Sequence, residues 1–198
     1  LYHVLVDQLQ GHVITFDYRG FGDSKPEDAL PSVQGVTNDT RAVFEWIISS
    51  GQISPKHVLL WGHSLGTGVM VRLLSQLPQQ INPLAAVLEA PFTSMREEIP
   101  HFPLAKLFSY LPYFDYAFVD PIVSNPELNF DSLSLLPRVW CPLLILHAKD
   151  DNIIPFRLGN KLYDSARKVQ PLGVANKTTF HAFPAGKGYR HNKLLKAP

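Results

Sequence analysis

Residues 57–68, HVLLWGHSLGTG, decide the fold. Residues 57–61 are apolar and β-prone and predict a strand, whereas residues 65–77 carry the apolar rhythm of a helix. Between them stands Gly62-His63-Ser64-Leu65-Gly66, a G-x-S-x-G motif. A strand, this motif and a helix in that order predict a tight turn that presents Ser64 at the carboxyl end of a sheet.

Small residues must flank Ser64 because such a turn is tight and strained. We expect Gly62 and Gly66 to supply the room, and Gly68 to let the helix approach the sheet closely. The backbone amide of Leu65 is placed at the positive end of the helix dipole, where it would donate to an oxyanion. The alternative is a glycine-rich turn with an incidental serine, and the order of strand, turn and helix argues against it.

Further short apolar runs alternate with helical patterns on both sides of this motif, which is typical of a parallel sheet. The predicted helices are residues 36–48, 65–77 and 156–169. The predicted strands are residues 12–16, 57–61, 85–88 and 143–146, with a weaker fifth at 178–183. We therefore predict an α/β fold, with a mostly parallel sheet and helices on both faces.

Residues 94–136 interrupt this alternation, and we call them the insertion. Five prolines between positions 100 and 126 exclude a long regular helix. Eight aromatic residues fall in the same stretch: Phe102, Phe108, Tyr110, Tyr113, Phe114, Tyr116, Phe118 and Phe130. We expect short helices lying over the sheet like a cap, whose rings either line an apolar pocket or pack the insertion onto the core.

Length and composition favour one globular domain spanning residues 1–198. The net charge of +1 offers no basic surface for nucleic acid. The one cysteine, Cys141, cannot form an internal disulfide and is expected to be a small buried residue. No apolar run approaches the roughly 20 residues of a membrane span. The first residues read as the middle of a helix, so we expect the chain to be a fragment.

A serine hydroxyl becomes a useful nucleophile only when a histidine takes its proton and an acid orients that histidine. In this fold the expected chain order is serine, acid, histidine. Asp150 and Asp151 follow the predicted strand 143–146 and lie where catalytic groups gather in parallel sheets, and the pattern alone does not choose between them.

Two histidines follow these acids. His181 falls inside the predicted strand 178–183, whereas His191 follows that strand in a glycine-containing loop and is the better candidate base. His63 adjoins the nucleophile in sequence, but on such a turn its side chain should point away from Ser64. No histidine and acid spacing suits a metal, and we infer no metal and no cofactor.

Four segments together resemble the abhydrolase-domain protein twelve family, whose members are serine lipases acting on monoacylglycerols and lysophosphatidylserine. They are DYRGFGDS (17–24), WGHSLGTG (61–68), LEAPFT (88–93) and CPLLILHA (141–148). The resemblance implies the α/β-hydrolase fold. It also implies Ser64 as nucleophile, Asp151 as acid and His191 as base.

The family's second oxyanion donor comes from a loop that would precede Leu1, and the resemblance places the earliest strands of the sheet there too. A domain without this donor is expected to be slow. Family members resemble membrane-anchored proteins of the endoplasmic reticulum with a lumenal active site. The resemblance thus implies a membrane association through a span or anchor outside residues 1–198. The sequons at Asn38 and Asn176 are compatible with a lumenal domain.

These observations predict a serine hydrolase that cleaves lipid esters, such as a lysophospholipid or a monoacylglycerol, through an acyl-enzyme on Ser64. Within the same class, a small-ester esterase or a thioesterase is the alternative. In a different class, the chain would be a catalytically inactive hydrolase fold that serves as a binding module.

Overall fold

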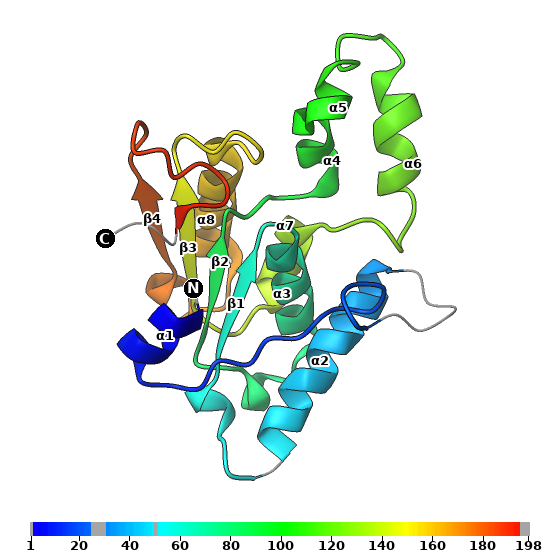
Figure 1. The fold of residues 1–198 in the computed structure, drawn as a ribbon. Coiled ribbons are helices and arrows are strands. Elements are labelled where there is room, and N and C mark those ends of the chain that lie inside the picture. The colour runs from blue at the N-terminus through cyan, green and yellow to red at the C-terminus, as the bar shows by residue number, and fades with distance from the viewer. Residues whose placement is uncertain (1, 25–30, 50, 195–198) are drawn as a thin grey trace.

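The fold of this chain is described here from a computed structural model, which covers residues 2–24, 31–49 and 51–194. Four strands form one parallel sheet in the order β1-β2-β3-β4 (Figure 1). The strands are β1 Leu59–His63, β2 Ala85–Glu89, β3 Leu143–Ala148 and β4 Thr179–Phe183. The longer helices are α1 Tyr2–Leu9, α2 Val33–Ser49, α3 Leu65–Gln76 and α8 Phe156–Val169. The short helices α4 Met95–Glu98, α5 Pro103–Lys106, α6 Asp120–Val123 and α7 Ser132–Leu135 lie between β2 and β3.

The register of the sheet brings the carboxyl ends of its strands to one edge. His63 at the end of β1 is paired with Glu89 at the end of β2. Ala148 at the end of β3 is likewise paired with Phe183 at the end of β4. The loops that follow β1, β3 and β4 therefore leave from the same end of the molecule, which is where ligands bind in open parallel sheets.

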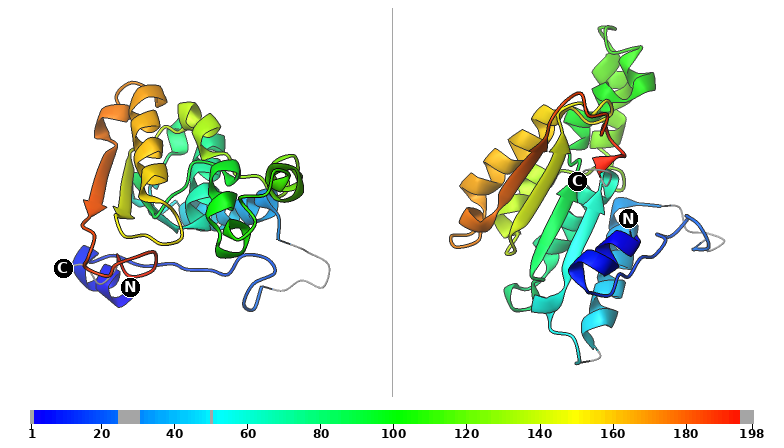
Figure 2. Two further views of the ribbon diagram at one scale, coloured as in Figure 1. Left: turned by 90° about the horizontal axis from the view of Figure 1, so that it is seen from above. Right: turned by 60° about the vertical axis from the view of Figure 1, so that its left-hand side comes forward.

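The two faces of the sheet are covered differently. Helices α3, α7 and α8 lie on one face, while α1 lies on the opposite face (Figure 2). The main core fills the space under α3 and α8 with fully buried side chains, among them Leu73 and Leu158. On β3, Ile145 points into this core, whereas its neighbours Leu144 and Leu146 are only partly buried. None of the α1 side chains is buried.

The predicted strand at residues 12–16 is wrong. This segment is extended but joins no ladder of the described sheet, and Ile14 and Phe16 remain 46% and 38% exposed. A β-prone pattern becomes a strand only beside a free strand edge. In the described structure this segment pairs with neither edge strand of the sheet, β1 or β4.

The other four predicted strands are present, each with bounds that differ by one or two residues from the prediction. β1 begins two residues later than predicted because Pro55–His57 form a 3₁₀ turn, in which Ser54 Oγ accepts the Lys56 N–H at 3.3 Å. The strand then continues to His63, directly before Ser64. The weak fifth strand is confirmed as β4.

The insertion leaves the sheet after β2 and projects away from the body of the molecule (Figure 1). Part of it has a small core of its own, formed by Ile99, Ala105, Phe114 and Val119 and separate from the main core. Phe114 and Phe130 are buried, as the packing interpretation predicts, but the other six aromatic side chains are exposed. Among the described helices, none combines the length and the apolar character needed to cross a membrane.

Cys141 precedes β3 and is 1% exposed, as predicted. Burial raises the pKa of its thiol to about 12, against a smaller opposing effect of Lys56. The thiol is therefore protonated at neutral pH.

Replacing Leu73 by Ala is expected to lower the free energy of unfolding by about 2 to 5 kcal/mol, because it leaves a cavity under α3. Leu172→Ala is the matched control, since that side chain is 99% exposed, and should change stability by less than about 0.5 kcal/mol. Chemical denaturation of both variants measures the difference. Equal effects would contradict the placement of the core.

Candidate active site

Ser64 stands at the junction of β1 and α3 in a strained backbone conformation, with φ +52° and ψ −119°. Positive φ is uncommon for a residue with a side chain and persists only where its surroundings enforce it. The Ser64 N–H donates to the Glu89 carbonyl of β2 at 2.9 Å. The Ser64 carbonyl accepts from the Thr67 N–H at 2.9 Å and from the Thr67 hydroxyl at 2.6 Å. The turn is thus fixed to both the neighbouring strand and the following helix.

The three glycines around Ser64 differ in what they do. A Cβ at Gly62 would lie 2.5 Å from the Gly66 carbonyl oxygen, so this position accepts no side chain. A Cβ at Gly66 would meet only the Tyr18 hydroxyl, at 3.9 Å, so its own side-chain space is open. A Cβ at Gly68 would lie 2.8 Å from Phe130 and 3.1 Å from Phe92. Gly68 therefore makes room for two aromatic rings rather than for the sheet, which corrects the prediction.

Three predicted residues meet in one hydrogen-bonded chain. His191 Nε2 lies 3.0 Å from Ser64 Oγ, and His191 Nδ1 lies 2.9 Å from Asp151 Oδ2. The residues come from the loops after β1, β3 and β4, which the parallel register brings to one edge. His191 is 5% exposed and the Asp151 side chain is fully buried.

Asp151 has all of its acceptor capacity engaged. Its Oδ1 accepts the N–H groups of Ile153 and Ile154, both at 2.9 Å. Burial raises the pKa of this carboxyl, but hydrogen bonds from His147, His191 and the Ile153 N–H outweigh it and hold the pKa below its usual range. Asp151 is therefore ionised at neutral pH and oriented by its donors.

Asp150, the other candidate acid, points elsewhere. Its Oδ1 accepts the Arg190 N–H at 3.1 Å, and Arg190 has a positive φ of +48°. Asp150 thus holds the turn that presents His191. His181 contacts Phe183 on β4, and none of its described contacts reaches Ser64 or Asp151.

Two further histidines support the site, and sequence reasoning did not assign them these positions. His63 Nε2 lies 3.0 Å from the His191 carbonyl oxygen, and the two rings pack with centroids 4.8 Å apart. His147 is fully buried, with Nε2 3.0 Å from the Ile154 carbonyl and 3.4 Å from Asp151 Oδ2. A Cβ at Gly159 would lie 2.2 Å from the His147 ring, so that glycine makes room for it. The pairing of Gly159 with His147 spans two elements, and no local pattern signals it.

The backbone amide of Leu65 follows Ser64 as the first residue of α3. The first amide groups of a helix have no acceptor within the helix and are free to donate to a bound group.

Glu98 brings a buried carboxyl from the insertion toward the site. Its neighbours make two contacts with α8: Glu97 with Lys161 at 2.6 Å, and His101 with Arg157 at 2.7 Å. Glu98 itself is 2% exposed, and within the described residues neither carboxyl oxygen has a hydrogen-bond partner. Burial, together with the charge of Asp151, raises its pKa to about 8, against an opposing effect of Arg157.

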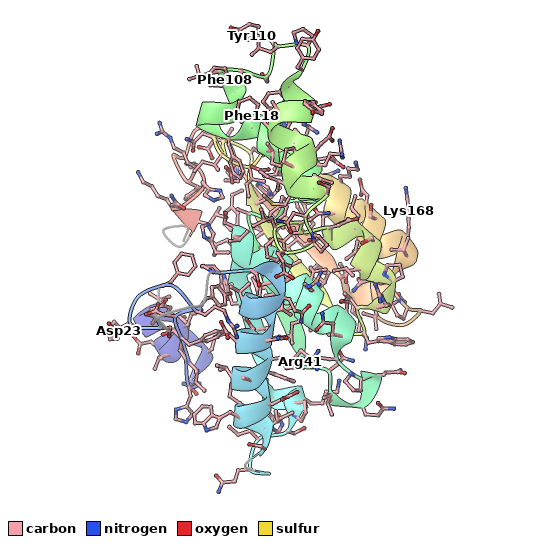
Figure 3. The ribbon with its side chains drawn as sticks, turned by 90° about the vertical axis from the view of Figure 1, so that its right-hand side faces the viewer. Asp23, Arg41, Phe108, Tyr110, Phe118 and Lys168 are labelled. Carbon is pink, nitrogen blue, oxygen red and sulfur yellow. The ribbon has the colours of Figure 1, made fainter. Side chains whose placement is uncertain are left out.

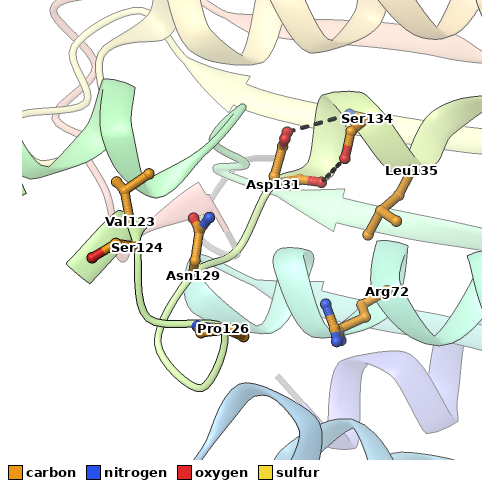
Figure 4. Close-up of a pocket in the computed structure, with 8 residues that line it drawn as sticks. All are labelled: Arg72, Val123, Ser124, Pro126, Asn129, Asp131, Ser134 and Leu135. Carbon is orange, nitrogen blue, oxygen red and sulfur yellow. Dashed lines mark hydrogen bonds between the residues drawn. The ribbon is translucent and has the colours of Figure 1, made fainter. Parts of the chain in front are cut away.

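A pocket of about 250 Å³ opens between α3 and the base of the insertion (Figure 4). Its lining mixes polar and apolar side chains: Arg72, Val123, Ser124, Pro126, Asn129, Asp131, Ser134 and Leu135. This lining does not include Ser64, Asp151 or His191. It also includes none of the eight aromatic residues of the insertion. The pocket is therefore distinct from the Ser64 site and is not the apolar pocket considered for the insertion.

Comparison with known families agrees with this geometry. Residues 2–114 match the family described as serine aminopeptidase, S33. This chain is a member of the serine aminopeptidase S33 family. The match includes the Ser64 turn, and together with the parallel sheet it confirms the expected α/β-hydrolase fold.

Individual proteins are similar in sequence to this S33-family chain over all or nearly all of its length. The chain is 44% identical, over its whole length, to lysophosphatidylserine lipase ABHD12 of Danio rerio, and 43% identical to that of Mus musculus. It is 38% identical to protein ABHD12B of Homo sapiens over 94% of its length. It spans about half the length of these relatives, from 48% to 50%.

Solved structures share the fold at low identity. The Pyrococcus furiosus esterase Pf2001 superposes with a TM-score of 0.63 at 20% identity, over 91% of this chain and 62% of that one. The Paleococcus ferrophilus monoacylglycerol lipase gives 0.60 at 19% identity, over 96% and 80% of the two chains.

Gly62→Ala is expected to destabilise the protein by about 1 to 3 kcal/mol or to displace the turn, because the added methyl group would overlap the Gly66 carbonyl. Gly66→Ala is the control, since the added group meets only ordinary contact. Urea denaturation and labelling of Ser64 by a fluorophosphonate measure both effects. A larger loss of stability or of Ser64 labelling in Gly66→Ala than in Gly62→Ala would contradict this geometry.

Glu98→Gln tests the buried carboxyl. The folded state binds the Glu98 proton more tightly than the unfolded chain does, so its contribution to stability is complete below the ordinary pKa and is lost as pH rises toward about 8. We expect the melting temperature of Glu98→Gln, relative to wild type, to be higher at about pH 9 than at about pH 5. Glu97→Gln, which changes the partly exposed partner of Lys161, should show no such trend. A constant difference across this pH range would refute the raised pKa.

Proposed function

We propose that this chain is the core of the catalytic domain of a serine hydrolase that cleaves lipid esters through an acyl-enzyme on Ser64. The observation that carries the proposal is the hydrogen-bonded chain Asp151–His191–Ser64, with distances of 2.9 and 3.0 Å, on a strained turn. A protein that only binds a partner has no physical need for a buried ionised acid, a shielded imidazole and a strained serine that are joined by successive hydrogen bonds. This argues against the inactive binding module.

The reaction begins when His191 Nε2 takes the proton of Ser64 Oγ as this oxygen attacks the ester carbonyl. A bond forms between Oγ and the acyl carbon, and the carbonyl oxygen becomes an oxyanion that accepts the Leu65 N–H. When this intermediate collapses, the ester C–O bond breaks and the leaving alcohol takes the proton from His191. Asp151 stabilises the imidazolium throughout, since it stays ionised and touches Nδ1.

Water then repeats the sequence on the acyl-enzyme. His191 removes a proton from the water, the hydroxyl oxygen bonds to the acyl carbon, and the fatty acid leaves as Ser64 regains its proton. Loss of one oxyanion donor commonly costs about 2.7 to 4 kcal/mol. Residues 1–198 supply the Leu65 donor, and a segment upstream of Leu1 is proposed to supply the second.

The substrate class rests on the relatives. Those of 43 to 44% identity are named lysophosphatidylserine lipases. We propose a single-chain lipid ester, such as lysophosphatidylserine or a monoacylglycerol, with a small ester or a thioester as the alternative substrate.

The membrane location is part of the same proposal. We propose a catalytic domain in the lumen of the endoplasmic reticulum, attached through a segment outside residues 1–198. The asparagines of both sequons, Asn38 and Asn176, are exposed on the surface, as a glycosylated asparagine must be.

The deciding experiment exposes the full-length protein to a fluorophosphonate probe and then measures hydrolysis of lysophosphatidylserine, monoacylglycerol, a short soluble ester and a thioester. Ser64→Ala should abolish labelling, and Asp151→Asn should lower kcat by about 10⁴-fold, because the histidine loses its orienting anion. Asp150→Asn and His181→Ala are the matched controls and should retain most activity.

Each outcome has a distinct meaning. A folded full-length protein without labelling would overturn the hydrolase proposal in favour of a binding module. Labelling with turnover of the short ester alone would replace the lipid substrate by a small one. Loss of activity in Asp150→Asn equal to that in Asp151→Asn would reassign the acid.

A further inference from the structure

The insertion exposes apolar side chains that the proposed reaction does not use. We call residues 102–118 the aromatic tip. Among the side chains of this segment that the structure describes, eight large hydrophobic ones are exposed: Phe102, Leu107, Phe108, Tyr110, Leu111, Tyr113, Tyr116 and Phe118. Exposed apolar side chains also gather on α1, at Tyr2, Val4, Val6 and Leu9, whereas the remaining ones are more widely spaced. The aromatic tip concentrates eight of them in 17 consecutive residues, which marks an interaction surface.

The aromatic tip is preformed. Phe118 stacks between Phe108 and Phe114, with centroid distances of 5.6 and 5.3 Å and interplanar angles of 11° and 20°. Phe114 belongs to the separate small core of the insertion and is buried. The exposed rings therefore stand on a packed base and need no rearrangement to meet a partner.

The position of the aromatic tip leaves it free of the body. Tyr110 lies at the far end of the projecting insertion, with Phe108 and Phe118 just below it (Figure 3). The insertion follows β2 at the same end of the sheet as Ser64 (Figure 1). A surface touched by the aromatic tip would thus lie on the side of the molecule where the proposed reaction takes place.

The chemistry of the aromatic tip matches the interface of a bilayer. Tyr110, Tyr113 and Tyr116 are 76% to 79% exposed and combine an apolar ring with a polar hydroxyl, as side chains at membrane interfaces do. Lys106 and Asp115 are its only charged residues, so its net charge is zero. A projecting shape with adaptable, amphipathic rings suits a fluid surface better than a shaped protein groove.

We propose that the aromatic tip docks on a phospholipid bilayer and inserts its tyrosine rings at the headgroup level. Because the tip carries no net charge, docking requires neither anionic lipid nor low salt. The consequence for catalysis, delivery of a lipid ester from the bilayer toward Ser64, rests on the proposed function; the docking itself does not.

The first test reads docking without catalysis. A polarity-sensitive fluorophore is attached to Tyr113→Cys in the full-length protein, reconstituted in phosphatidylcholine vesicles after replacement of reactive cysteines outside residues 1–198. Cys141 does not compete for the label, since its thiol is buried and protonated. The control carries the label at Leu172→Cys, which follows α8 and is 99% exposed.

The expected result is blue-shifted emission at position 113 and quenching by brominated phosphatidylcholine, unchanged by salt, while the label at position 172 remains in water. Equal quenching at the two positions, or none at 113, would overturn the proposal. Quenching that needs anionic lipid would refute an uncharged docking surface.

The second test separates docking from a general effect on the enzyme. Replacing Tyr110, Tyr113 and Tyr116 together by Ser is expected to lower kcat/KM for a vesicle-borne lysolipid roughly tenfold, because less apolar area enters the bilayer. Hydrolysis of a soluble short ester and fluorophosphonate labelling of Ser64 should stay unchanged. A change in oligomeric state in the triple variant, with unchanged use of the vesicle-borne substrate, would instead assign the aromatic tip to self-association.

Discussion

The geometry of the whole site depends on the hydrogen bond that the Ser64 N–H donates to the Glu89 carbonyl oxygen. This bond joins the end of β1 to the end of β2 at the point where the backbone adopts φ +52°. Gly62 and Gly66 can then approach so closely that no side chain fits at position 62. With the turn held on the sheet, the Ser64 hydroxyl faces the loops after β3 and β4, and the axis of α3 points toward it. The geometry of the site therefore depends on the sheet as well as on the G-x-S-x-G motif.

Around this turn, the polar groups form two layers of support. Asp151 Oδ1 accepts two backbone N–H groups, and Asp151 Oδ2 lies close to the rings of both His191 and His147. His191 is held at its ring by Asp151 and at its backbone carbonyl by His63. Asp150 fixes the preceding residue, Arg190. A buried anion is tolerable only when donors replace the water that it has lost. The supporting groups thus explain both how Asp151 stays charged and why His191 has one orientation.

Local patterns were sufficient for the parts of the structure that depend on neighbours in sequence. The strand, turn and helix around Ser64 and the glycine loop of His191 were predictable, because their residues fix backbone conformation nearby. Residues 12–16 were mispredicted because a strand also needs a partner edge, which a single segment does not reveal. The contacts of His63 with His191 and of Gly159 with His147 span separate elements. The sequence shows that the insertion is rich in tyrosines. Whether each ring faces a pocket, the core or solvent depends on the backbone path of the whole insertion, which no local pattern determines.

The distance in sequence between Ser64 and His191 has a consequence for how the protein is made. These two side chains, 127 positions apart, meet only when nearly the whole sheet is assembled, and contacts of such long range form late. During translation the Ser64 turn emerges well before its base. A nascent chain therefore passes through much of its synthesis with Ser64 lacking its histidine partner, and the hydrogen-bonded chain Asp151–His191–Ser64 forms only once β4 has joined the sheet and residue 191 has left the ribosome.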